Sequence, residues 1–176
     1  MSKIYKIIVT GPFNSGKTAF IRTISDIDVV TTERRITTED RGIKAETTVA
    51  MDYGRVELDG KVLHLHGTPG QARFDFMWEI LAREMNGFIV LADSVDHPSF
   101  SEAGDLIDLF SNFHSVPYLV AANKTDLSGA ASLLEVRRGT RAGSDITVMP
   151  CVATQKSSVR QVLLQIIELI DKQRAS

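Results

Sequence analysis

The chain has 176 residues, of which 43% are hydrophobic and 24% are charged, and its net charge is -2. This length and composition predict a single domain over residues 1–176 with an ordinary globular interior, and they exclude a disordered or fibrous chain. A net charge near zero gives no broad positive field, so we do not expect nucleic acid as a general partner.

Membrane attachment and disulfide bonding are also not expected. The longest apolar runs, residues 87–92 and 116–122, are far shorter than the roughly 20 residues that cross a bilayer. Ser2 and the C-terminal residues offer none of the usual lipidation sites, so no intrinsic membrane anchor is predicted. Cys151 is the only cysteine, and no signal peptide precedes the first apolar run. The expected location is therefore cytoplasmic.

Apolar, β-branched stretches alternate with longer amphipathic ones along the chain, which is typical of an α/β domain with a largely parallel sheet. In chain order, the predicted strands span residues 3–10, 48–58, 61–66, 87–93, 116–123 and 146–152. The predicted helices span residues 17–25, 74–85, 98–113, 130–141 and 159–172. Asp59 and Gly60 form a tight turn, so the second and third strands should be antiparallel. The predicted fold is a six-stranded, mainly parallel sheet with one antiparallel strand and about five helices.

Residues 26–47 do not fit this alternation. They are rich in Thr, Arg, Glu and Asp and show little periodicity. Connections of this length are uncommon unless they are functional or mobile. Two interpretations stay open, a disordered surface loop and a segment that senses a ligand.

A phosphate-binding loop follows the first predicted strand. Residues 11–18 read Gly-Pro-Phe-Asn-Ser-Gly-Lys-Thr and lead into a helix, which is the context that this motif requires. Glycines let backbone N–H groups converge on phosphate oxygens, and the helix N-terminus adds a positive dipole. We expect Lys17 to contact the terminal phosphates and the Thr18 hydroxyl to coordinate a bridging Mg²⁺. The residues predicted to bind at this loop are Gly11, Asn14, Ser15, Gly16, Lys17, Thr18 and Ala19.

A second motif points to the base. A buried-strand pattern at residues 117–122 ends in Asn-Lys-Thr-Asp at residues 123–126, and doubly wound sheets bind ligands at such carboxyl ends. The Asp126 carboxylate can accept two N–H groups from a guanine edge, which adenine cannot offer in the same arrangement. Asn123 and Lys124 are expected to brace the loop. The pattern therefore favours GTP over ATP.

With these motifs in this order, the sequence resembles the Ras-like small GTPases, and within them the Arf-like and bacterial MglA-type branches. The likeness covers essentially the whole chain and rests on residues 11–18, 47–52 (a first switch), 67–71 (a second switch) and 123–126. It implies a three-layer P-loop NTPase G domain that depends on Mg²⁺. It also implies switch loops near residues 26–48 and 67–76 that grip the γ-phosphate and relax after it leaves.

The resemblance also implies roles for single residues in catalysis. Gln71 matches the glutamine that orients the attacking water, and with Lys17 it completes the predicted catalytic pair. The Gly70 amide would contact the γ-phosphate. Thr48 is the expected switch threonine that closes on Mg²⁺, because the next strand begins directly after it, and Thr47 is the alternative.

Around the base, the resemblance implies that residues 151–154 back the guanine, with Ala153 donating its amide to the guanine carbonyl and Thr154 beside it. This stretch departs from the usual Ser-Ala-Lys. In the phosphate loop, Phe13 stands where many Ras relatives have glycine, and its bulk could obstruct an arginine from an activating protein. Arg41 and Arg73 are candidate internal arginines, although a surface position is the commoner explanation for an arginine.

Another departure lies at the second switch. Most relatives place an aspartate there that steadies Mg²⁺ through water, where this chain has Gly67. Asp93, at the end of a neighbouring predicted strand, is a candidate substitute.

Three functions are compatible with these motifs. The leading interpretation is a molecular switch that binds GTP or GDP and slowly hydrolyses GTP with Mg²⁺, with an effector protein at the switch loops. Gly67 and Phe13 motivate the alternative, a non-hydrolysing interaction module. An ATP-dependent kinase or ATPase is the third, and it lacks an identifiable acceptor site. The bacterial branch also implies a Roadblock-type activating or scaffold protein as partner.

Other notable side chains fit ordinary packing. His64 and His66 share one face of a predicted strand. The sequence has no third ligand at suitable spacing, so we do not expect them to bind a metal. Cys151 is expected to be a small buried residue. The aromatic cluster after the second switch should be divided between the core and an effector-docking patch, and it comprises Phe74, Phe76, Met77 and Trp78.

Overall fold

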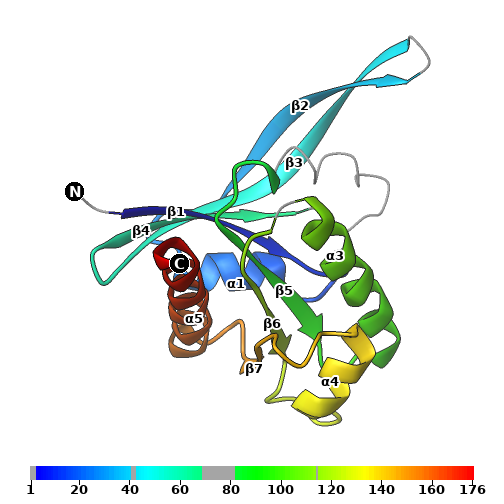
Figure 1. The fold of residues 1–176 in the computed structure, drawn as a ribbon, viewed down its shortest axis with the longest axis vertical. Coiled ribbons are helices and arrows are strands. Elements are labelled where there is room, and N and C mark those ends of the chain that lie inside the picture. Colours follow the sequence, from blue (N-terminus) through cyan, green and yellow to red (C-terminus); the bar gives the residue numbers. More distant parts are fainter. Residues whose placement is uncertain (1–2, 41–42, 69–81, 114) are drawn as a thin grey trace.

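The computed structural model of the chain describes residues 3–40, 43–68, 82–113 and 115–176. The strands are β1 (Lys3–Thr10), β2 (Val30–Asp40), β3 (Ile43–Leu58), β4 (Lys61–Gly67), β5 (Gly87–Asp93), β6 (Tyr118–Asn123) and β7 (Val148–Cys151). The helices are α1 (Lys17–Ile24), the 3-10 helix η2 (His97–Ser99), α3 (Phe100–Phe113), α4 (Leu133–Thr140) and α5 (Lys156–Ala175). Figure 1 shows their arrangement.

The strands form one sheet in the order β2-β3-β4-β1-β5-β6-β7. β1 pairs in parallel with β4 and β5, and β5, β6 and β7 continue in parallel. Among the described strands only β3 runs against its neighbours, because it pairs antiparallel with both β2 and β4. The predicted mainly parallel α/β sheet with one antiparallel strand is therefore confirmed.

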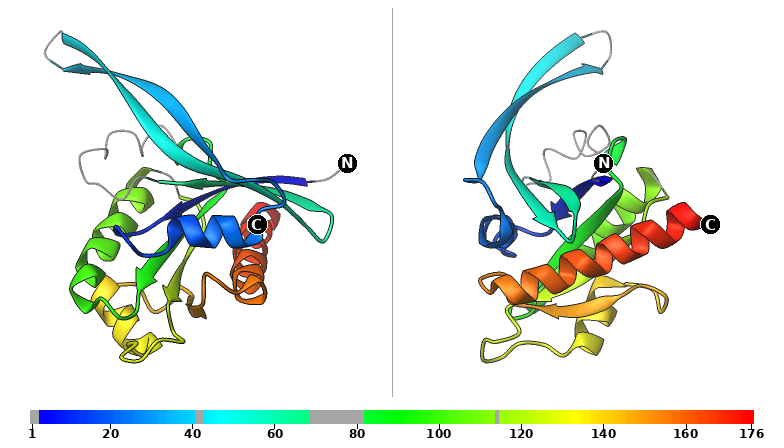
Figure 2. Two further views of the ribbon diagram at one scale, coloured as in Figure 1. Left: turned by 180° about the vertical axis from the view of Figure 1, so that it is seen from behind. Right: turned by 90° about the vertical axis from the view of Figure 1, so that its left-hand side faces the viewer.

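The sheet has one strand more than the sequence predicts. Residues 30–40, which were expected to belong to an irregular segment, form β2, and β3 begins at Ile43 rather than at residue 48. The two strands pair from Val30 opposite Tyr53 to Asp40 opposite Ile43. Only residues 52–58 of β3 also pair with β4. The outer part of the β2–β3 pair therefore extends away from the helices (Figures 1 and 2).

Helices cover both faces of the sheet, and each face has its own hydrophobic core. Tyr5, Ile7 and Val9 of β1 point toward α1 and α5, whereas Ile8 points to the face covered by α3 and α4. Figure 2 shows α5 and α3 on opposite sides of the sheet. The predicted apolar stripe of α5 is buried in the first of these cores; it comprises Val159, Val162, Leu163, Ile166, Ile167 and Ile170.

Four of the five predicted helices are present within a few residues of their expected ends. α4 starts later than predicted because Ser132 and Glu135 form a capping box, in which the Ser132 hydroxyl accepts from the Glu135 amide at 3.2 Å. The helix predicted at 74–85 lies mostly outside the described residues. None of the helices in the described ranges combines the length and the hydrophobicity of a membrane-spanning segment.

Candidate functional site

The site lies along one rim of the sheet. Because β1, β5, β6 and β7 run in parallel, their carboxyl ends lie at the same edge. The loop at residues 11–18 leaves β1 there, and the loop at residues 123–127 leaves β6 there. The sheet thus brings together two motifs that are more than 100 residues apart in the chain.

The phosphate loop closes tightly onto the start of α1. Asn14 and Gly16 adopt left-handed backbone angles, with φ of 66° and 106°. A Cβ atom on Gly16 would lie 2.3 Å from Asn123 Nδ2, so only glycine fits at this approach. The Phe20 amide donates to the Gly16 carbonyl at 2.9 Å, which begins the helical hydrogen bonding. The positive end of α1 therefore faces the loop.

Lys17 is folded back over this loop. Its ammonium donates to the carbonyl oxygens of Gly11 at 2.7 Å and Pro12 at 2.8 Å. Burial lowers the Lys17 pKa to about 8, although the negative charges of Glu102 and Asp52 oppose this shift. A cation held in this way is positioned for an anion bound by the loop, because it needs only to exchange carbonyl oxygens for phosphate oxygens.

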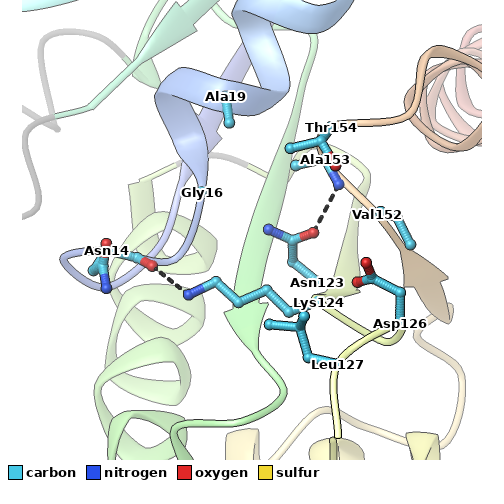
Figure 3. Close-up of a pocket in the computed structure, with 10 residues that line it drawn as sticks. All are labelled: Asn14, Gly16, Ala19, Asn123, Lys124, Asp126, Leu127, Val152, Ala153 and Thr154. Atoms are coloured by element: carbon cyan, nitrogen blue, oxygen red, sulfur yellow. Dashed lines mark hydrogen bonds between the residues drawn. The ribbon is translucent and has the colours of Figure 1, made fainter.

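A pocket of about 340 Å³ opens between the phosphate loop and the loops after β6 and β7 (Figure 3). Its ten lining residues are Asn14, Gly16, Ala19, Asn123, Lys124, Asp126, Leu127, Val152, Ala153 and Thr154. All ten come from the two predicted motifs, the residues that directly follow them and the stretch predicted to back the base, and Asp126 is among them. The pocket thus combines amide-rich backbone, an acidic acceptor and apolar walls.

Asn123 is the link between the three loops. Its Nδ2 donates to the Ser15 carbonyl at 2.9 Å, and its Oδ1 accepts from the Ala153 amide at 2.9 Å. The side chain is buried, so both bonds are shielded from water. Lys124 adds a second tie, because its ammonium donates to the Asn14 carbonyl at 3.0 Å. The base loop therefore fixes the backbone of the phosphate loop.

The stretch after β7 forms the back of the pocket. The amide of Ala153 already donates to Asn123, and its predicted contact with a guanine carbonyl stays a prediction, as does the role of Thr154. The Cys151 carbonyl accepts from the Thr125 hydroxyl at 3.3 Å. Burial raises the pKa of the Cys151 thiol to about 11, which keeps it protonated and agrees with a packing role.

Beside Thr18, the predicted Mg²⁺ ligand, lies Asp52, the last residue of the predicted first switch. The Thr18 hydroxyl donates to Asp52 Oδ2 at 2.5 Å. Asp93, the predicted substitute for the missing aspartate, is instead bound to the Lys124 ammonium at 2.6 Å and to the Val95 amide at 3.1 Å. Asp93 therefore supports the base loop, and Asp52 is the carboxylate in contact with Thr18.

A sequence signal for Asp52 existed in the Asp59-Gly60 turn. Both residues have positive φ, as the tight hairpin requires. A turn at these two residues pairs Leu58 with Lys61 and, counting outward, Asp52 with Gly67. The predicted hairpin thus already placed an acid opposite the glycine that departs from the family pattern.

Several predicted site residues cannot be assigned a geometry. Gly70 and Gln71 lie outside the described residues, as do Arg41, Arg73 and the aromatic cluster at 74–78. Thr48 and Thr47 are described through their backbone, which lies in β3 opposite Arg35 and Ile36. Thr48 is four residues from Asp52 along an extended strand, or roughly 13 Å. The role of Thr48 as a Mg²⁺ ligand stays a prediction.

The side chains set aside as packing residues behave accordingly. Tyr53 Oη and His64 Nδ1 are hydrogen bonded at 2.5 Å, and the Tyr53 ring packs against both histidines. Burial lowers the His64 pKa below its usual value. The ranges that the structure describes contain no group of three or more His, Cys, Asp or Glu side chains able to hold a metal ion. Phe13, in contrast, is 76% exposed on the phosphate loop.

Comparison with known proteins gives three kinds of similarity. A model of the family described as "conserved hypothetical ATP binding protein" matches residues 26–173. An uncharacterized protein of Methanocaldococcus jannaschii is 33% identical over 123 residues, which are 69% of this chain and 71% of that protein. ADP-ribosylation factor-related protein 1 of Rattus norvegicus is 27% identical over 139 residues, which are 76% of this chain and 65% of that protein.

Among solved structures, the small GTPase Arl6 of Trypanosoma brucei with a bound nucleotide analogue, GppNp, superposes with a TM-score of 0.75. The match covers 97% of this chain and 99% of that one at 19% sequence identity. At this identity the likeness shows a shared fold. It agrees with the strand order and with the helices on both faces of the sheet.

Proposed function

Because the chain belongs to the family of conserved hypothetical ATP binding proteins and, with its Arf-like relatives, to the Ras-like small GTPases, we propose that it is a guanine-nucleotide switch. It binds GTP and GDP with Mg²⁺ and slowly hydrolyses GTP. The observation that carries this proposal is the pair of hydrogen bonds through which Asn123 joins the phosphate loop to the loop after β7. These bonds hold the phosphate loop next to the pocket, so a single nucleotide can place its phosphates on the loop and its base in the pocket.

The base is guanine in this proposal, although the family description refers to ATP. An ionised carboxylate only accepts hydrogen bonds, and Asp126 lies among the residues that line the pocket. A guanine edge offers two N–H groups to such an acceptor, whereas adenine presents an unprotonated ring nitrogen there. Adenine would leave the carboxylate facing a lone pair, which is a repulsive arrangement.

Mg²⁺ fits the residues beside the phosphate loop. This ion prefers oxygen ligands, keeps several waters and is usually held by one or two carboxylates together with substrate phosphates. Thr18 supplies a hydroxyl oxygen at the start of α1, and the Asp52 carboxylate is in hydrogen-bond contact with it. When bound, the ion would neutralise charge on the β- and γ-phosphates.

The chain's own residues then perform positioning rather than strong acid–base chemistry. Backbone amides of the loop and the Lys17 ammonium hold the terminal phosphates, and Gln71 orients the attacking water. Thr48 closes on the nucleotide only if the segment that carries it leaves the extended strand. The two nucleotide states therefore differ in the β2–β3 region, where an effector protein would read them.

The alternative is an interaction module that binds nucleotide without hydrolysing it. Two features favour it: Gly67 replaces an aspartate of the family, and Phe13 is exposed at the edge of the phosphate loop. An aromatic side chain there would obstruct an arginine supplied by a partner. The alternative keeps the same base and phosphate contacts and differs only in turnover.

The experiment begins with denaturing the purified protein and identifying any released nucleotide by chromatography. Phosphate release from loaded GTP is then followed in a single turnover with and without Mg²⁺, for wild type and for Gln71→Ala. The switch proposal expects turnover that needs Mg²⁺ and falls at least about tenfold in Gln71→Ala. No phosphate from nucleotide-loaded wild type would favour the non-hydrolysing module. Lys17→Ala is expected to abolish GTP binding in either case.

A further inference from the structure

The contact between Thr18 and Asp52 joins two functional segments. Thr18 is the second residue of α1 and the predicted Mg²⁺ ligand, and Asp52 lies in β3, which begins in the first switch region. The Thr18 hydroxyl donates to Asp52 Oδ2 at 2.5 Å. The side chains are 34 positions apart, so the contact exists only because β3 packs beside α1.

The strand register places this carboxylate next to the position where the family pattern has an aspartate. Asp52 and Gly67 are directly opposite each other in the antiparallel β3–β4 pair, so their side-chain positions lie on the same face. A Cβ atom built on Gly67 would lie 3.4 Å from the Cβ of Asp52. The side chain of Asp52 on β3 therefore leaves the backbone in van der Waals contact with the place where an aspartate side chain at position 67 on β4 would begin.

Hydrogen-bond chemistry makes the arrangement suitable for a cation. A hydroxyl has one proton and two acceptor lone pairs. When Thr18 gives its proton to Asp52, its lone pairs stay available to a metal ion, and the carboxylate fixes the direction in which they point. Outer-shell carboxylates of this kind orient metal ligands and raise metal affinity.

Electrostatics place Asp52 in the same charged neighbourhood as the phosphate-binding lysine. Its negative charge acts on Lys17 and opposes the lowering of the Lys17 pKa that burial causes. Glu102, at the start of α3, acts in the same direction, and its side chain is exposed. Asp93 is held by Lys124 and the Val95 amide. Of the described acids, Asp52 is the one with a hydrogen bond to Thr18.

We infer that Asp52 is the acidic residue that supports Mg²⁺ at this site, supplied from β3 to replace the aspartate that relatives carry on β4 at the position of Gly67. The inference rests on the proposed function, since it assigns a residue to the Mg²⁺ of that site. Asp52 is a positioning residue here: it would act on the metal through the Thr18 hydroxyl, to which it is hydrogen bonded.

The test measures Mg²⁺ affinity rather than hydrolysis. The protein is loaded with a fluorescent GDP, and the rate of GDP release is recorded while free Mg²⁺ is varied. Asp52→Asn keeps the size of the side chain and an acceptor oxygen but removes the charge. It is expected to raise the Mg²⁺ concentration for half-maximal retention of GDP by about tenfold or more. In excess EDTA, the release rates of Asp52→Asn and wild type should agree within about twofold, because no metal is left to support.

Two variants serve as controls. Glu57→Gln removes a charge from an exposed position of the same strand and should leave the Mg²⁺ midpoint unchanged. The double variant Asp52→Asn with Gly67→Asp moves the carboxylate to the neighbouring strand and should restore most of the lost Mg²⁺ affinity. Its new Cβ would lie 3.0 Å from the terminal methyl of Ile21, which can move by the few tenths of an ångström required.

The outcomes separate the two proposals. An Asp52→Asn midpoint within about twofold of wild type, with equal release in EDTA, overturns the inference and leaves nucleotide binding intact. A wild-type chain that retains no GDP at any Mg²⁺ concentration contradicts the proposed function, and the inference falls with it. A raised midpoint that the double variant restores supports a carboxylate role that a general loss of stability could not produce.

Discussion

At the scale of single residues, Asn123 and Lys17 determine how the site is held together. Asn123 uses both ends of its amide, and each partner is a backbone group of a different loop. Lys17 uses carbonyl groups of its own loop. The first residue therefore couples the two loops, whereas the second holds an ammonium group over its own loop, where a phosphate is proposed to bind.

Replacing Asn123 should damage both stability and binding. Asn123→Ala removes two shielded hydrogen bonds and leaves the Ala153 amide without this acceptor, which is expected to cost about 2–3 kcal/mol in the free energy of unfolding. Urea unfolding measures this value. Thr125→Ala, which loses a single longer bond in the same loop, is the matched control and should cost less than about 1 kcal/mol. Equal losses in the two variants would show that Asn123 is not the link.

The Lys17 pKa predicts how affinity depends on pH. With a pKa of about 8, the ammonium is charged at neutral pH and loses its proton as the pH rises through that value. A bound phosphate favours the charged form and raises the pKa, so binding above pH 8 must take up a proton. Affinity for GDP should be flat near neutral pH and roughly tenfold weaker one unit above the Lys17 pKa.

Calorimetric titration of GDP across this pH range measures the effect. Lys17→Arg is the control, because a guanidinium keeps its charge throughout. The affinity of Lys17→Arg for GDP should not show the tenfold loss that is expected of the wild type above the Lys17 pKa, whatever its value at neutral pH. Titration of the base itself affects both proteins equally. Parallel pH profiles for the two proteins would exclude Lys17 as the titrating group.

At the scale of elements, most of the sheet and helices follow from sequence periodicity, and β2 does not. The strands β1 and β5 are buried throughout their carboxyl halves, and their sequences are continuous apolar runs. The buried residues of α5 recur at helical spacing, which makes this helix equally easy to predict. Residues 30–40 instead alternate Thr, Arg and Glu, and only β3 pairs with them. A segment whose sequence lacks apolar–polar alternation is not recognised as a strand by its periodicity, although its Val, Ile and Thr favour the extended conformation.

The same limit applies to the metal side of the site. The phosphate loop and the base motif were found because each is contiguous in sequence. Asp52 contacts Thr18 because β3 packs beside α1, and its inferred role in place of the missing aspartate depends on its pairing with Gly67. The spacing of motifs does not indicate which residues of separate elements pack together. The Asp59-Gly60 turn, in contrast, predicts the register that places Asp52 opposite Gly67.

The β2–β3 pair gives a prediction for the switch. Thr48 lies in β3, and closing on a nucleotide requires its segment to leave the strand. Loading with a non-hydrolysable GTP analogue should therefore increase amide hydrogen exchange of residues 43–51 by about tenfold or more relative to the GDP form, as paired amides are released. Residues 62–67 of β4, which pair with β1, provide an internal reference that should not change. Equal exchange of residues 43–51 in both forms would contradict movement of this segment.

At the scale of the whole molecule, the sheet order explains why distant motifs form one site. Parallel strands β1, β5, β6 and β7 deliver their loops to one rim, and β3, the antiparallel strand, brings Asp52 to the start of α1. The residues proposed to contact base, phosphate and metal thus come from four separate stretches of the chain. A Roadblock-type partner and an effector stay predictions that rest on the family resemblance.

The most direct measurement is a calorimetric titration of nucleotide-free protein with GDP and, separately, with ADP in the presence of Mg²⁺. Two hydrogen bonds from guanine to a carboxylate, each of about 1.5–3 kcal/mol, predict GDP binding at least roughly 100-fold tighter than ADP. Asp126→Asn should remove most of that preference while phosphate contacts persist. Equal affinities for GDP and ADP in the wild-type protein would contradict the assignment of this chain as a guanine-nucleotide switch.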